Sequence, residues 1–234
     1  DLSLFFGQSS FSQYVVTRAS NAVVVDPDVD LTLLGPLGCG IQTGSGTVLN
    51  RLKPVVGESL VVFGCGAVGL SAIMAAKLTG CSQIIAVDIH ASRLALAGEL
   101  GATHQINGKE QDAVAVIKQI TGKGAHYAVE TTGVSAIVLQ AVHAVKPLGT
   151  VAIVGFTGDI TLNVQNDLMA EGKSLVGVIE GDAVPALFIP LLVQLYKQGK
   201  FPIDKLIARY PLADINQAFA DSASGKVIKP VVVM

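Results

Sequence analysis

The chain has 234 residues, of which 50% are hydrophobic and 15% charged, and its formal net charge is -2. A chain of this length and hydrophobicity can bury a core, so a disordered tail is excluded. The small net charge, without any run of Lys or Arg, gives no reason to expect nucleic acid as a partner. None of the cysteines, Cys39, Cys65 and Cys81, forms a Cys-x-x-Cys pair, which indicates reduced thiols in a cytoplasmic protein.

The start of the chain indicates a piece of a longer protein. The sequence begins at Asp1 rather than at a methionine, and its first residues read as the middle of a strand. These residues lack the basic segment and the cleavage pattern of a signal peptide. We therefore expect a further segment ahead of Asp1 in the intact protein.

An apolar stretch at residues 61–80 has two alternative interpretations. It carries no charge until Lys77, as a membrane-spanning helix would. However, residues 60–63 favour a short buried strand, three glycines follow at once, and a helical pattern begins only at about residue 68. A strand, a glycine turn and a helix therefore fit better than one continuous span, and we expect no membrane partner.

Strand and helix patterns alternate through the residues that follow. Predicted strands lie at 83–89, 103–107, 126–133, 149–156 and 173–181. Predicted helices lie at 92–101, 112–121 and 135–145, with Asp112 placed to cap the second. Alternation at this spacing implies right-handed crossovers and predicts an α/β protein with a doubly wound parallel sheet.

Two more helices are predicted beyond the sheet. The first, at 184–200, is amphipathic and is interrupted by Pro190. The second, at 213–225, has Asp214 as its cap. The apolar face of the first helix could bind a partner, but packing into the core is the favoured interpretation. Because a missing segment would leave part of that face uncovered, we expect the isolated chain to be oligomeric or prone to aggregation.

The pattern Gly-x-Gly-x-x-Gly occupies the turn between the first predicted strand and helix, where it binds the pyrophosphate of a dinucleotide. Gly64 permits the tight turn, Gly66 lets the backbone approach the phosphates, and Gly69 lets the helix pack closely on the sheet. The amide N–H groups of Ala67 and Val68 then donate to the phosphates. The alternative is a glycine turn that binds no ligand.

An acidic residue supports the dinucleotide interpretation. Asp88 ends the next predicted strand, 19 residues after Gly69, where a ribose-binding carboxylate belongs. A carboxylate accepts hydrogen bonds from both ribose hydroxyls and repels a 2′-phosphate, so the predicted cofactor is NAD rather than NADP. Arg93 could bind a 2′-phosphate, but beside Asp88 we interpret it as a second contact to the ribose or phosphate. A solvated helix charge is the alternative for Arg93.

Residues 33–50, LLGPLGCGIQTGSGTVLN, together with the glycine pattern that follows them, resemble the zinc-dependent medium-chain alcohol dehydrogenases. The segments FFGQSSFSQY, LGATHQIN, GVIEG and LYKQGKFP are similar to the bacterial aryl-alcohol (benzyl alcohol) dehydrogenases. The resemblance implies a Rossmann dinucleotide-binding domain with remnants of a GroES-like catalytic domain. It places the first remnant at 1–40, the Rossmann domain at 41–180 and the carboxyl-terminal part of the catalytic domain at 181–234.

The resemblance also implies roles for residues that no pattern singles out. Cys39 and Thr43 would be catalytic, Cys39 as a zinc ligand and Thr43 as a contact to the nicotinamide. From the residues alone, Cys39 is more simply a small buried side chain. Glu180 stands at a position that is often hydrophobic in the wider family, and we assign it no role. The other implied cofactor contacts are Thr132 and Gly133 at the adenosine, Val154 and Ile179 at the nicotinamide, and Lys229 at the pyrophosphate.

The implied activity is NAD-dependent oxidation of a primary, aromatic alcohol to its aldehyde, assisted by zinc. Catalytic zinc needs three protein ligands, and 38 residues ahead of Cys39 leave no room for the upstream two. We therefore expect zinc only in the intact enzyme and residual activity at most in this chain. The alternatives are a zinc-free NAD(P)H quinone oxidoreductase or reductase of the same superfamily, which Cys39 and Asp88 argue against, and a non-catalytic dinucleotide-binding module. The resemblance further implies a homo-oligomer.

Overall fold

The computed structural model describes residues 11–234, which form two compact units. The larger unit is Cys39–Ala183, and the smaller combines the described residues up to Gly38 with Val184–Met234. The strand expected at the start of the chain falls largely on residues 1–10, outside the described residues. Residues 11–18 form no strand.

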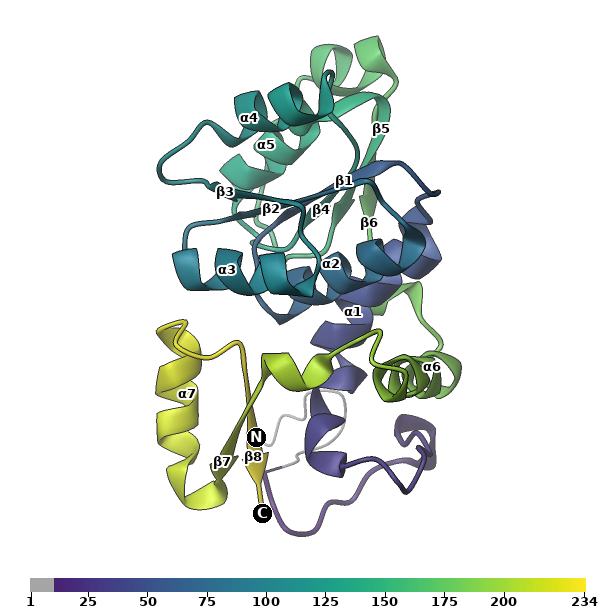
Figure 1. The fold of residues 1–234 in the computed structure, drawn as a ribbon, viewed down its shortest axis with the longest axis vertical. Coiled ribbons are helices and arrows are strands. Elements are labelled where there is room, and N and C mark those ends of the chain that lie inside the picture. The colour runs from purple at the N-terminus through teal and green to yellow at the C-terminus, as the bar shows by residue number, and fades with distance from the viewer. Residues whose placement is uncertain (1–10) are drawn as a thin grey trace. The chain divides into compact units, whose positions relative to one another are not determined.

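The larger unit is built on a six-stranded parallel sheet of order β3-β2-β1-β4-β5-β6 (Figure 1). The strands are β1 (Ser59–Phe63), β2 (Gln83–Asp88), β3 (His104–Asn107), β4 (Ala125–Glu130), β5 (Val145–Ile153) and β6 (Ser174–Gly177). In Figure 1 helices cover both faces: α2 (Ala67–Thr79) and α3 (Ala91–Leu100) on one, α4 (Ala113–Thr121) and α5 (Ser135–Ala144) on the other. The predicted doubly wound α/β fold is confirmed.

The order of the strands indicates where a ligand would bind. The chain runs from β1 outward to β3 and then returns to β4 on the other side of β1. At such a reversal the loops after the two central strands diverge and leave a crevice at the carboxyl edge of the sheet, where α/β proteins bind ligands. All of β1 is buried, as the unbroken apolar run at residues 60–63 predicts for a strand covered on both faces.

A helix that the sequence analysis did not predict precedes the sheet. Helix α1 (Gly40–Gly46) continues as a π-helical turn to Leu52. Its glycines allow close packing: a Cβ on Gly44 would lie 1.9 Å from the carbonyl oxygen of Val68, and one on Gly46 would lie 2.4 Å from that of Gly181. Glycine lowers helix propensity, so here tertiary packing rather than local preference stabilises the helix.

The smaller unit holds the remaining strands and α-helices. They are the parallel pair β7 (Ile207–Pro211) and β8 (Lys229–Val233) and the helices α6 (Pro185–Lys197) and α7 (Ile215–Ala223). Helix α6 buries Phe188 and Leu192, whereas Leu187 and Leu191 on the same helix are 74% and 48% exposed. Within residues 11–234, every helix is too short or too polar to cross a bilayer.

Three sequence predictions need correction. Helix α6 runs through Pro190 without interruption, because the missing N–H removes one hydrogen bond and the rest of the helix persists. Asp214 stands at the start of α7, but its side chain makes no capping hydrogen bond. A 3-10 turn leads directly into α7, so Asp214 lacks the extended backbone of a capping residue (φ -100°, ψ 19°). The last strand of the sheet ends at Gly177 rather than 181, because its partner β5 ends at Ile153, the residue paired with Gly177.

The two aspartates at helix starts give a matched test. The Oδ1 atom of Asp112 accepts a hydrogen bond of 3.1 Å from the amide of Ala115, as predicted. We expect Asp112→Ala to lower the free energy of unfolding by about 1 kcal/mol, because this cap is lost. Asp214→Ala removes no such bond, so its loss should stay below about 0.5 kcal/mol. Urea denaturation followed by circular dichroism measures both, and equal losses would contradict the assignment.

Candidate functional site

The three glycines after β1 differ in their surroundings. Gly64 has a φ of +92°, which glycine adopts without strain, and its amide donates to the carbonyl of Val87 at 2.8 Å. A Cβ on Gly69 would lie 1.8 Å from the carbonyl oxygen of Gly64, so α2 packs directly on the turn. A Cβ on Gly66 would meet no atom within 4 Å. The backbone at Gly66 therefore faces open space, as a phosphate-binding turn requires. We call the turn from Gly64 to Gly69 the glycine cradle.

Helix α2 directs unpaired donors toward that space. It begins at Ala67, and Gly66 before it has no side chain with which to cap the helix. The first amides of a helix have no intrahelical acceptor, and within residues 11–234 none takes the N–H groups of Ala67 and Val68. Together with the positive end of the helix dipole, these amides form a site for an anion.

Asp88 lies at the mouth of the cradle. Its Oδ2 atom accepts a hydrogen bond of 2.6 Å from the amide of Cys65, and its Oδ1 atom accepts from the amides of Ile89 and His90 at 2.7 and 2.9 Å. These three bonds fix the carboxylate, which is 8% exposed. The adenosine ribose predicted at Asp88 would thus lie next to a pyrophosphate in the cradle.

Burial affects two more groups, the thiol of Cys65 and the Nε atom of Arg93. Burial raises the pKa of the Cys65 thiol, and the charge of Asp88 raises it further, while Arg93 opposes the rise. Cys65 is therefore a neutral, inert side chain under the cradle. The Nε atom of Arg93 is buried and has no hydrogen-bond partner among the described residues. A buried donor without a partner is costly, so a ligand that accepts from Arg93 would stabilise the site.

Two residues that the sequence analysis missed lie at the end of β4 and directly after it, on the other side of β1 from Asp88. Glu130 is fully buried at the end of β4, and its carboxylate accepts from the amides of Thr132 and Gly133 at 2.7 and 3.2 Å and from the Thr132 hydroxyl. The hydroxyl of Thr131 donates to the carbonyl oxygens of Phe63 and Gly64. An acidic residue at a strand end was the available signal, but the predicted strand continued through it to 133.

A second cluster forms around Glu180. Its Oε2 atom accepts from Gln42 Nε2 at 3.1 Å and from the Thr43 hydroxyl at 3.3 Å, and its Oε1 atom lies 3.9 Å from the Cys39 sulfur. Cys39 and Thr43 come from α1 and its start, whereas Glu180 follows β6. The structure therefore brings the two predicted catalytic residues together around a carboxylate that the sequence analysis left without a role.

The turn that carries Glu180 has an unusual backbone. Glu180, Gly181 and Asp182 have φ values of +48°, +68° and +49°. Such left-handed non-glycine residues cost about 1–3 kcal/mol each and persist only where neighbours enforce them. Here Asn50 donates to the carbonyl of Gly181 at 3.0 Å, and Arg51 pairs with Asp182 at 2.6 Å. These contacts hold Glu180 against α1.

The other predicted contacts are distributed over both units. The amide of Val154 donates to the carbonyl of Glu130 at 2.9 Å, and Ile179, two residues past β6, is 80% exposed. Both lie where strands of the sheet end. Lys229 begins β8 in the smaller unit, unlike the other predicted residues, and its contact to a pyrophosphate stays a prediction.

The described residues do not by themselves fit a zinc site. Within residues 11–234, no three side chains of His, Cys, Asp and Glu are grouped so that they could hold a metal ion. Cys39 and Glu180 provide two neighbouring donors, whereas catalytic zinc takes three protein ligands. The metal role of Cys39 stays a prediction.

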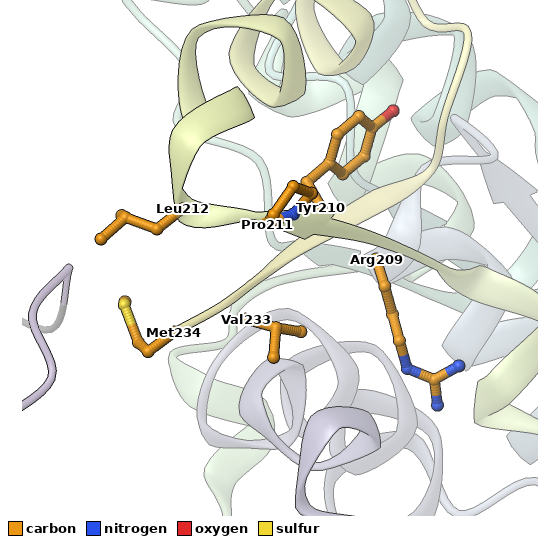
Figure 2. Close-up of a pocket in the computed structure, with 6 residues that line it drawn as sticks. All are labelled: Arg209, Tyr210, Pro211, Leu212, Val233 and Met234. Carbon is orange, nitrogen blue, oxygen red and sulfur yellow. The ribbon is translucent and has the colours of Figure 1, made fainter.

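A pocket in the smaller unit offers no comparable chemistry. It has a volume of about 410 Å³ and is lined by Arg209, Tyr210, Pro211, Leu212, Val233 and Met234 (Figure 2). Figure 2 shows the Arg209 and Tyr210 side chains on opposite sides of β7. Arg209 binds Asp30 at 2.8 Å, and the Tyr210 hydroxyl donates to Asp221 at 2.7 Å, so both polar groups are already engaged. The other lining residues are apolar.

Comparison with known proteins identifies the family. Residues 67–197, more than half of the chain, match the family model described as zinc-binding dehydrogenase, and the chain belongs to this family. It is 44% identical to geraniol dehydrogenase of Castellaniella defragrans, over 99% of this chain and 63% of that protein. It is 34% identical to alcohol dehydrogenase 1 of Pisum sativum, over 98% of this chain and 62% of that protein.

A solved structure agrees with the fold. The crystal structure of benzyl alcohol dehydrogenase from Acinetobacter calcoaceticus matches with 52% sequence identity and a TM-score of 0.95, over 97% of this chain and 64% of that chain. The predicted membership in the zinc-dependent medium-chain alcohol dehydrogenases is confirmed. The chain spans 58–63% of the length of three of the curated relatives it matches.

The glycine cradle predicts a contrast between two similar substitutions. Gly69→Ala should lower the free energy of unfolding by about 2–3 kcal/mol, because its methyl group would overlap the carbonyl oxygen of Gly64. Gly66→Ala places its methyl group in open space and should cost less than about 1 kcal/mol. Urea unfolding of both variants measures the difference. If Gly66→Ala were as destabilising as Gly69→Ala, the cradle would not be open.

Proposed function

We propose that the chain binds NAD and that the whole protein uses it to oxidise an alcohol. The observation that carries this proposal is the 2.6 Å hydrogen bond from the amide of Cys65 to Asp88, which fixes a carboxylate beside an open glycine cradle. In this arrangement the pyrophosphate accepts from the amides of Ala67 and Val68, and the adenosine ribose donates to Asp88. Arg93 offers its buried Nε donor to the same end of the cofactor.

The remaining predicted contacts follow the cofactor across the sheet. Thr132 and Gly133 would contact the adenosine and its linkage, and Lys229 the pyrophosphate. Thr43, Val154 and Ile179 would surround the nicotinamide. Ile179 exposes an apolar surface that an aromatic ring would cover. The domain limits at 40 and 180 and a homo-oligomeric state belong to the same proposal.

The chemistry follows from the cofactor and its placement. NAD accepts a hydride from the carbon that bears the alcohol, and the protein supplies orientation and excludes water. Cys39 is proposed as one zinc ligand of the whole protein. The similarity to a benzyl alcohol dehydrogenase and a geraniol dehydrogenase supports a primary alcohol as substrate. In both alcohols the reacting carbon adjoins an aromatic ring or a double bond, which conjugates with the carbonyl group of the product.

Cofactor binding is tested by calorimetric titration of the chain with NAD and NADP. We expect NAD to bind more tightly than NADP, because Asp88 accepts from the ribose hydroxyls and repels a 2′-phosphate. Asp88→Ala should weaken NAD binding by about tenfold or more and NADP binding much less. Asp112→Ala, which removes the bond to Ala115 at the start of α4, is the control and should bind NAD normally. Equal affinity of the unaltered chain for NAD and NADP would contradict the role of Asp88.

Substrate choice is tested in the whole protein by measuring NADH formation with zinc present. We expect a higher kcat/KM for benzyl alcohol and geraniol than for hexanol, because both products are conjugated. Equal values for the three alcohols would contradict the proposed substrate class. Tight NAD binding without any turnover would favour the non-catalytic dinucleotide-binding module.

A further inference from the structure

We propose that the carboxylate of Glu180 raises the affinity of this site for oxidised NAD⁺ relative to its affinity for NADH. The inference rests on the proposed NAD site and adds a determinant of redox state to it. Neither the glycine pattern nor Asp88 can make this distinction, because the adenosine, riboses and pyrophosphate are identical in the two forms. Only groups close to the nicotinamide ring, which is cationic in NAD⁺ and neutral in NADH, can do so.

The topology places Glu180 at the nicotinamide end of the cofactor. Asp88 ends β2 and the cradle follows β1, so a dinucleotide bound at both extends along the carboxyl edge toward β4, β5 and β6. Glu180 lies three residues past the end of β6. A chain of contacts joins it to the cradle: Val68 packs on Gly44 of α1, and the neighbouring Thr43 donates to Glu180.

The charge of Glu180 is not neutralised by the described residues. Its hydrogen-bond donors, the Gln42 amide and the Thr43 hydroxyl, are neutral. The nearby cation, Arg51, is already paired with Asp182 at 2.6 Å. No ion pair joins Glu180 to a Lys or Arg within residues 11–234. A carboxylate that is partly buried and unpaired in this way attracts a cation more strongly than one in bulk water does.

The position of the charge is fixed as well as its sign. The left-handed turn at 180–182 packs so closely on α1 that a Cβ on Gly181 would lie 2.4 Å from the carbonyl oxygen of Gln42. The bond from Asn50 to Gly181 and the pair of Arg51 with Asp182 hold the turn from its other side. The carboxylate therefore need not be reordered when the ring binds, and its attraction acts in full on the oxidised form. NADH, which lacks the ring charge, would leave the site more readily.

The test is a pair of titrations with NAD⁺ and NADH in the presence of a chelator, which excludes any effect of metal. Glu180→Gln keeps the shape of the side chain and an acceptor for Thr43 but removes the charge. We expect it to weaken NAD⁺ binding about tenfold and to change NADH binding less than about twofold. The matched control is Asp112→Asn at the start of α4, which also removes one carboxylate charge and keeps an oxygen that can accept from Ala115. It leaves the pair of Arg51 with Asp182 intact, so the ratio of the two affinities should stay as in the unaltered chain.

A measurement without substitutions keeps the test independent of folding. Raising the ionic strength should lower the ratio of NAD⁺ to NADH affinity of the unaltered chain, because salt screens the attraction between Glu180 and the ring. The pyrophosphate contributes equally to both affinities and cancels in the ratio. Equal weakening of both cofactors by Glu180→Gln, or a ratio that salt does not change, would overturn the inference alone. Failure of the unaltered chain to bind either cofactor would overturn the proposed function itself.

Discussion

The hydrogen bond from the amide of Cys65 to the carboxylate of Asp88 joins the loops that follow two neighbouring parallel strands. It can form because β1 and β2 pair in a register that sets Phe63 opposite Val87, so that both strands end at the same edge. The positive φ of Gly64 then turns the chain so that the amide of Cys65 points toward β2. Thr131 binds the same turn from the side of β4. The cradle is thus held by three adjacent strands, and its shape does not depend on a ligand.

A second constraint places the nicotinamide end of the proposed site. Helix α1 packs through Gly44 on the first turn of α2 and through Gly46 on the turn at 180–182. Small residues at both points let three backbone segments approach one another closely. Cys39, Thr43 and Glu180 are brought together by this packing. The left-handed residues of the turn show that local backbone preference yields here to the packing of the turn on α1.

The sequence predicts the parts of this structure that depend on local patterns. Alternation of strands and helices predicts the sheet. The glycine spacing predicts the turn at Gly64, the open backbone at Gly66 and the close packing at Gly69. Helix α1 could not be predicted, because its glycines disfavour a helix until tertiary packing on α2 stabilises it. The partners of Glu180 lie 137 and 138 residues away in the chain, so no window of sequence contains them. Pro190 and Asp214 show the opposite error, in which a local rule was applied where the surrounding structure overrode it.

A crystal structure of the chain with bound NAD would show whether the glycine turn and Asp88 bind the cofactor. We expect the pyrophosphate over Gly66, within hydrogen-bond distance of the amides of Ala67 and Val68, and ribose hydroxyls about 2.7 Å from the Asp88 carboxylate. We expect the nicotinamide beyond β4, on the side of Glu180. A dinucleotide bound elsewhere, or one whose ribose makes no contact with Asp88, would contradict the proposed site.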